Sequence, residues 1–138
     1  MKLMLDTSAY VGFKRNITAI VEKIVAAESI LMSPVVLGEL LFGFRSGNRM
    51  EKNLKDLDEF LNHEVVSLVE IGAITADRFS RIAAILKSQG TPIPSNDIWI
   101  AAHAMEYGAE LITLDHHFEK IPGLVYTRFH LPPKLMAS

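Results

Sequence analysis

The 138-residue sequence contains no cysteine. Disulfide bonds, thiolate-bound metal sites and cysteine nucleophiles are therefore excluded. The absence suits a reducing compartment such as the cytoplasm, where disulfides are rare. We expect the chemistry of this chain to depend on side chains that carry oxygen and nitrogen atoms.

Long apolar runs are also lacking. No apolar stretch approaches the ~20 residues that a helix needs to span a bilayer. Asp6 interrupts the apolar start of the chain before a signal-peptide core could form. Hydrophobic residues make up 49% of the sequence and charged residues 22%, a balance typical of globular proteins. We therefore expect one soluble, cytoplasmic domain over residues 1–138 that does not contact a membrane.

The sequence has no surplus of positive charge, because 14 lysines and arginines face 16 aspartates and glutamates, for a net charge of −2. A nucleic-acid partner would therefore need local basic groups or metal ions to offset the carboxylates of the chain. Lys14, Arg15, Arg45 and Arg49 fall in predicted loops near strand ends, where they could contact phosphates. An ordinary solvated surface explains these four residues equally well.

Short apolar runs predict about five strands, with the last at an edge of the sheet. They lie at 2–6, 29–33, 65–69, 110–115 and 124–129. Apolar residues at helical spacing predict helices between them, at 16–27, 34–44, 49–63, 75–88 and 96–108. Ser33 and Pro34 are the expected N-cap and first residue of the second of these helices. Strands that alternate with helices predict an α/β fold with a mainly parallel central sheet.

Two of these helices carry further expectations. The charges of the helix at 49–63 should form a solvated face, because its apolar residues form a single stripe. In the helix at 96–108, helical spacing indicates that four side chains pack in the core rather than form a ligand-stacking face. They are Trp99, Ile100, Ala101 and Ala104.

Three aspartates fall where parallel α/β sheets build binding sites, beyond the carboxyl ends of strands. Asp6 ends the first predicted strand and Asp115 the fourth, while Asp97 lies in the first turn of a helix with Ser95 or Asn96 as its expected cap. Each aspartate also has an ordinary explanation. Asp6 could cap a short following helix, Asp97 could favour the helix macrodipole, and Asp115 could cap a turn.

Glu39, within "VVLGELLFGF", lacks such an explanation. It lies too far into its helix to act as a cap, and its neighbours three and four residues away make its own face apolar. A carboxylate there is costly unless a cation compensates it. Four converging carboxylates would also raise one another's pKa values, and a hard cation such as Mg²⁺ or Mn²⁺ removes that penalty. The pattern therefore favours metal-assisted hydrolysis of phosphodiesters.

Four segments, in this order, resemble the PIN-domain ribonucleases and, within them, the VapC toxins of toxin–antitoxin pairs. They are "LDTSAYV", "VVLGELLFG", "PSNDIWIAAHA" and "LITLDHHFEKIPGL", and the similarity runs from residue 2 to about 129. The resemblance implies a three-layer α/β/α fold and endonucleolytic RNA cleavage by a metal-activated water. It places four carboxylates around a Mg²⁺ site, where Mn²⁺ is also possible: Asp6, Glu39, Asp97 and Asp115. Asp6 and Asp97 match the positions of direct ligands.

The resemblance also implies partners. VapC toxins are generally homodimers that bind a small antitoxin, VapB, which blocks the site. The complex then binds its own operator DNA through the antitoxin. Thr113 matches a hydroxyl position beside the site. Many relatives carry an acidic residue immediately before the phenylalanine that Phe118 matches, whereas this chain has His117. Imidazole could bind a softer divalent ion, so a second Mg²⁺ site is less expected; alternatively, His116 and His117 are two exposed loop histidines.

Three functions stay open at this point. The first is an active, metal-dependent endoribonuclease toxin, favoured by the complete set of acidic residues. The second is a catalytically silent binding module that acts as antitoxin partner and co-repressor, which agrees with the negative net charge. The third is metal-dependent hydrolysis of DNA ends or flaps, as in distant relatives. The apolar segment "LLFGF" could belong to the core or to a surface for a dimer or antitoxin.

Overall fold

The computed structural model describes residues 1–131, and a five-stranded sheet forms its centre. The strand order is β3-β2-β1-β4-β5, and every pairing is parallel. The strands are β1 (Lys2–Leu5), β2 (Ser29–Met32), β3 (Val66–Leu68), β4 (Glu110–Thr113) and β5 (Tyr126–Arg128). All five lie within the predicted segments, with β5 at an edge, so the predicted α/β fold is confirmed.

Six α-helices and one short 3₁₀ helix, η1, connect the strands within the described part of the chain. They are α1 (Thr7–Lys14), α2 (Thr18–Val25), α3 (Pro34–Arg45), α4 (Met50–Leu61), α5 (Ala73–Gln89), α6 (Ser95–Tyr107) and η1 (His116–Lys120). The sequence analysis gave α1 no bounds and mentioned it only as a short helix that Asp6 could cap, and it treated the residues of η1 as a loop. Lys14 and Arg45 are the last residues of α1 and α3, so their placement in loops was wrong.

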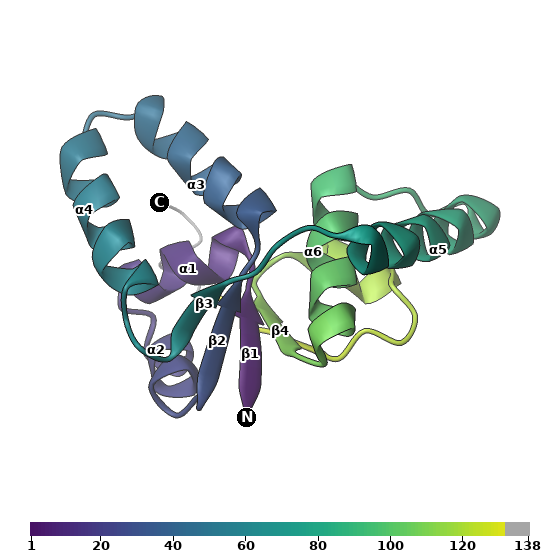
Figure 1. The fold of residues 1–138 in the computed structure, drawn as a ribbon, viewed down its shortest axis with the longest axis horizontal. Helices are drawn as coiled ribbons and strands as arrows, with labels where there is room; N and C mark the ends of the chain where they lie inside the picture. Colours follow the sequence, from purple (N-terminus) through teal and green to yellow (C-terminus); the bar gives the residue numbers. More distant parts are fainter. Residues whose placement is uncertain (132–138) are drawn as a thin grey trace.

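The direction in which the chain crosses the sheet decides which face each helix covers. From β1 to β3 the chain moves one way across the sheet, and from β3 to β5 it moves the other way. Because crossovers between parallel strands are right-handed, α1 to α4 cover one face and α5 and α6 the opposite face. Figure 1 shows the two groups on either side of the strands. The direction reverses between β1 and β4, where open α/β sheets bind their ligands.

The core sits on both faces of this sheet. Leu3, Met4 and Leu5 of β1 and Leu111 and Ile112 of β4 are fully buried. Strands covered on both sides are apolar throughout rather than alternating, which is why short apolar runs located them correctly.

Helix α6 packs against the sheet as predicted. Ile100, Ala101 and Ala104 are buried, and half-buried Trp99 stacks on Phe79 of α5 with 4.1 Å between ring centroids. These side chains are therefore packing residues, not a ligand-stacking face. Among residues 1–131, every helix is too short or too polar to cross a bilayer.

Candidate metal centre

Asp6 stands at the carboxyl end of β1, beside β4. Its backbone N–H donates to the Ile112 carbonyl over 3.2 Å. Its side chain is only 4% exposed, and Oδ1 accepts hydrogen bonds from Ala9 N at 2.8 Å and Ser8 Oγ at 2.7 Å. Oδ2 accepts one from the Thr113 hydroxyl at 2.5 Å. Asp6 is thus the N-cap of α1, as its ordinary explanation proposed, and it also lies between the two central strands.

The pKa of Asp6 is raised above its ordinary value, chiefly because burial disfavours the charged form. Hydrogen bonds from Thr113, Ser8 and Ala9 lower the pKa, while the charge of Asp115 raises it. Three donors therefore do not fully compensate the buried carboxylate. A nearby cation would stabilise its ionised form.

Glu39 joins three helices. It projects from α3, where its Oε1 accepts a hydrogen bond from the Thr7 hydroxyl of α1 at 2.5 Å and its Oε2 accepts one from Asn96 Nδ2 of α6 at 3.2 Å. Asn96 was expected to be a candidate cap of α6, as was Ser95. Both expectations were wrong, because α6 begins at Ser95 itself and its N-cap, Pro94, makes no side-chain hydrogen bond. The polar partners of Glu39 thus come from other helices, which explains a carboxylate on an apolar helix face.

Asp97 lies in the first turn of α6, with its side chain 13% exposed. No described residue donates a hydrogen bond to its carboxylate. Burial raises the pKa of Asp97 from 3.8 to about 6, and the charges of Asp115, Asp6 and Glu39 add to this increase. His117 acts in the opposite direction. The charges of the other three predicted carboxylates thus act on Asp97. Among the described residues, the group whose possible ligand atoms all lie within 4.8 Å of one another is Asp115, His116 and His117.

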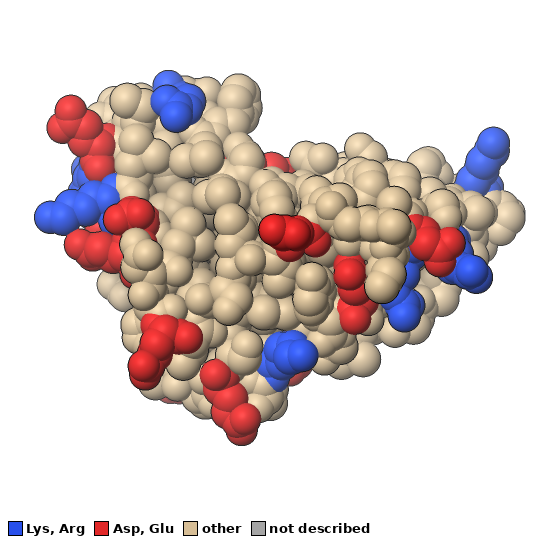
Figure 2. Space-filling model, viewed as in Figure 1, with Lys and Arg blue, Asp and Glu red and all other residues tan. Residues whose placement is uncertain are grey.

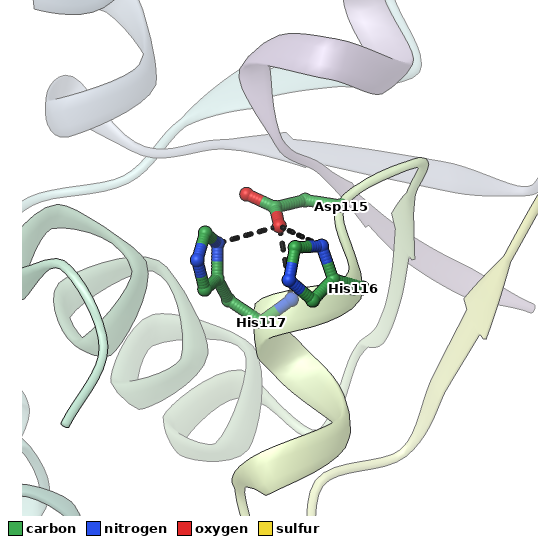
Figure 3. A group of neighbouring side chains, drawn as sticks. All are labelled: Asp115, His116 and His117. Atoms are coloured by element: carbon green, nitrogen blue, oxygen red, sulfur yellow. Dashed lines mark hydrogen bonds and ion pairs between the residues drawn. The ribbon is translucent and has the colours of Figure 1, made fainter. Parts of the chain in front are cut away.

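Asp115 follows β4 and caps η1 by accepting a hydrogen bond from the backbone N–H of His117 at 2.9 Å. The imidazole of His117 folds back over the same carboxylate, with Nδ1 2.7 Å from Asp115 Oδ1 and 3.5 Å from Asp97 Oδ2. His116 stacks on this ring with 4.4 Å between centroids, and Figure 3 shows both rings beside the Asp115 carboxylate. The interpretation of His116 and His117 as exposed loop residues holds only for His116, which is 63% exposed against 36% for His117.

Hydroxyl groups hold the carboxylates in place. The Thr113 hydroxyl donates to Asp6 and accepts from the backbone N–H of Asp115 at 2.9 Å, while Ser8 Oγ accepts from Leu114 N at 2.9 Å. Thr113 was expected beside the site, but Thr7 and Ser8 were not. Two hydroxyl residues directly after a strand-ending carboxylate were the signal available in the sequence.

Among the described residues, lysine and arginine side chains do not offset the negative charge of the four carboxylates. Within residues 1–131, no lysine or arginine forms an ion pair with Asp6, Glu39, Asp97 or Asp115. Their partners are hydroxyls, amides and the imidazoles of His116 and His117. On the face in Figure 2, acidic and basic side chains are interspersed, with no broad basic area.

Comparison with known proteins identifies the family. The sequence profile of the PIN domain matches residues 3–124. Ribonuclease VapC1 of Haemophilus influenzae (strain R2866) is 30% identical over 129 residues, which cover 90% of this chain and 95% of that protein. The chain belongs to the VapC family of PIN-domain ribonucleases. The resemblance seen in the sequence is therefore confirmed.

Two further relatives of this VapC-family chain are informative. The tRNA(fMet)-specific endonuclease VapC of Shigella flexneri is 29% identical over 127 residues, covering 90% of this chain and 95% of that one. The crystal structure of VapBC2 from Rickettsia felis, bound to a DNA fragment from the promoter, gives a TM-score of 0.83 at 26% identity. It covers 94% of this chain and 99% of that chain. Membership of a family of ribonucleases and endonucleases supports nuclease activity for this chain.

Proposed function

We propose that this VapC-family protein is a metal-dependent endoribonuclease, the toxin of a toxin–antitoxin pair. The observation that carries the proposal is the convergence of four carboxylates at the reversal point of the sheet, without a lysine or arginine partner among the described residues. Coupled carboxylates of this kind are costly without a cation. A silent binding module has no physical need for them.

The donor set fits a hard divalent cation such as Mg²⁺ or Mn²⁺, which prefers carboxylate oxygens and keeps several waters. We assign direct ligation to Asp6, Asp97 and Asp115. Asp97 accepts no hydrogen bond from a described residue, and Asp115 accepts its hydrogen bond on Oδ1, so both retain free oxygens. Both oxygens of Asp6 and both oxygens of Glu39 accept hydrogen bonds, so this criterion does not separate the two residues. We keep Asp6 as a direct ligand because it matches a direct-ligand position of the family, and we place Glu39, whose hydrogen-bond partners lie on α1 and α6, outside the direct ligands.

When bound, such a cation lowers the pKa of a coordinated water and stabilises negative charge on a phosphoryl oxygen. The chain contributes orientation. Thr113 and Ser8 fix the rotamer of Asp6, while Thr7 and Asn96 fix that of Glu39. Hydrogen bonds of this kind keep the ligands of a metal centre in place before the substrate arrives.

RNA is the substrate that the relatives favour, since they include ribonucleases and a tRNA(fMet)-specific endonuclease. Hydrolysis of DNA ends lacks such support. The structure also offers a basic groove of about 340 Å³, lined by Lys14, Arg15, Arg49 and Lys52 among other residues of α1, α3 and α4. It includes Val11, which lies one helical turn beyond Thr7, the residue whose hydroxyl bonds to Glu39. We propose that phosphates flanking the cleaved bond bind in this basic groove.

The partners follow from the relatives. The solved structure from Rickettsia felis contains VapB with VapC and promoter DNA, and that from Salmonella typhimurium is also a DNA-bound VapBC complex. We propose that this chain is one cytoplasmic domain over residues 1–138 that forms a homodimer. Its site would be blocked by a VapB-like antitoxin, which would bind operator DNA for the complex.

The test is cleavage of total cellular RNA by antitoxin-free protein in Mg²⁺, Mn²⁺ or EDTA. We expect discrete fragments that require metal and disappear in Asp97→Asn, while Asp58→Asn, an exposed residue of α4, cleaves as wild type. Sequencing the fragments identifies the RNA. Folded wild-type protein that shows no metal-dependent difference would refute the proposal in favour of the silent binding module.

A further inference from the structure

We propose that His117 is a nitrogen ligand of the divalent cation at this centre and makes the centre select Mn²⁺ over Mg²⁺. The proposal rests on the proposed function, since it requires a cation held by Asp97 and Asp115. It adds a ligand that carboxylate chemistry alone would not predict.

The position of one atom carries the inference. Nδ1 of His117 is inaccessible to solvent although the side chain as a whole is 36% exposed, and it makes no directed hydrogen bond within residues 1–131. It nevertheless lies 2.7 Å from Asp115 Oδ1 and 3.5 Å from Asp97 Oδ2. Nδ1 therefore lies close to one carboxylate oxygen of Asp115, the N-cap of η1, and to one of Asp97 in α6. Figure 3 shows the Asp115 side of this arrangement.

The spacing of these atoms suits a shared ion. Neighbouring ligands of an octahedral cation at ~2.1 Å lie roughly 3 Å apart. The two distances from Nδ1, 2.7 and 3.5 Å, fall on either side of that value. Asp115 and His117 belong to a group of side chains whose ligand atoms lie within 4.8 Å of one another, and rotation of the Asp97 side chain toward this group would bring all three donors onto one cation.

The ring is also held in place. The backbone N–H of His117 donates a hydrogen bond to Asp115 Oδ1 at 2.9 Å. The backbone and the ring of His117 therefore both contact the same carboxylate. On its other side the ring stacks on His116 at an interplanar angle of 29°. A ligand that is ordered before the ion binds loses little conformational freedom on binding.

A nitrogen donor changes which ion is preferred. Mg²⁺ takes oxygen ligands almost exclusively, whereas affinity for nitrogen-containing sites rises from Mn²⁺ along the first transition series. We therefore expect the ratio of the Mg²⁺ to the Mn²⁺ dissociation constant to fall about tenfold in His117→Asp, which restores an all-oxygen centre.

The experiment uses the full-length, antitoxin-free protein without a histidine tag, loaded with Mn²⁺. Pulsed electron paramagnetic resonance detects a ¹⁴N nucleus bound to Mn²⁺ independently of catalysis. We expect ¹⁴N coupling in wild type and in His116→Gln, the matched neighbour, and its loss in His117→Gln. Circular dichroism of each variant verifies its fold.

The possible outcomes separate this proposal from the preceding one. If wild type binds Mn²⁺ and loses that binding in Asp97→Asn, but shows no ¹⁴N coupling, His117 is not a ligand and the metal-dependent nuclease stands. Coupling that survives in His117→Gln or disappears in His116→Gln also overturns the assignment. If wild type binds no Mn²⁺ in an Asp97-dependent manner, both proposals fail.

Discussion

Asp97→Asn should stabilise the metal-free protein while removing a ligand of its proposed metal centre. The carboxylate is 13% exposed and lies near three other acidic side chains, so its ionised form is disfavoured in the folded state. Asparagine has nearly the same shape and carries no charge. The substitution therefore relieves repulsion that only a bound cation would otherwise compensate.

The size of the effect follows from the pKa of Asp97, which rises from 3.8 to about 6 on folding. At about 1.36 kcal/mol per pKa unit, ionised Asp97 lowers the free energy of unfolding by about 2–3 kcal/mol. Because the pKa is higher in the folded state, the folded state binds more protons between pH 4 and pH 6. The contribution of Asp97 to the stability of the metal-free protein therefore falls as pH rises through this range and stays level above it. Below pH 4, Asp97 becomes protonated in both the folded and the unfolded state and no longer lowers the free energy of unfolding.

The assay is urea denaturation in EDTA at pH 8 and at pH 4, with Asp58→Asn as the control. We expect Asp97→Asn to unfold at a higher urea concentration than wild type at pH 8 and at a similar one at pH 4. Mn²⁺ at 100 times its dissociation constant should stabilise wild type by about 2.7 kcal/mol and leave the variant unchanged. A variant that is less stable than wild type at pH 8, or equally stabilised at both pH values, refutes the coupled-carboxylate argument.

Other predictions test the groups around the centre. Thr113→Val keeps the shape of a fully buried side chain but removes its bond to Asp6 and the acceptor for Asp115 N. We expect urea denaturation to show a loss of about 2–4 kcal/mol, and Mn²⁺ titration an affinity about tenfold weaker; unchanged values would contradict the role of the hydroxyl. The double variant Lys14→Ala with Arg49→Ala should weaken RNA binding and reduce its salt dependence, measured by fluorescence anisotropy, without changing Mn²⁺ affinity. Lys87→Ala, on α5, is the matched control. If the control weakens RNA binding as much as the double variant does, the basic groove does not bind the RNA.

The strands and most helices were predictable because their signals are local. The central strands β1, β2 and β4 are buried on both faces, so an apolar run suffices to locate them. The ends of α5 and α6 were also predictable from glycines in the sequence. Gly90 and Gly108 end these helices with left-handed φ values of 69° and 63°, a conformation that favours glycine. Helix α1 carries no such pattern. It packs closely on α2, where a Cβ at Gly12 would lie 2.6 Å from Ile20 Cδ1, so a glycine stands where an apolar side chain would continue a stripe.

The carboxylates of the site were predictable in position but not in their partners. The places of the three aspartates follow from strand ends and a helix start, whereas Glu39 stood out as a carboxylate on an apolar helix face. Asn96 bonds to Glu39 rather than capping α6, and this depends on how α3 and α6 approach each other across the fold. The inward turn of His117 depends on η1, a short 3₁₀ helix whose first turn follows the Asp115 cap. Such contacts arise from tertiary structure and leave no periodic signal.

The pairing of β1 with β4 has a consequence for how the chain is made. Asp6 is synthesised more than 100 residues before the hydroxyl and the carboxylate beside it, Thr113 and Asp115. During translation β1 therefore lacks its second neighbour until β4 has left the ribosome. A centre assembled from segments so far apart in the sequence cannot exist before β4 is made. The cell that makes this protein thus meets a complete acidic centre only once the central sheet can form, when a partner can already recognise the fold.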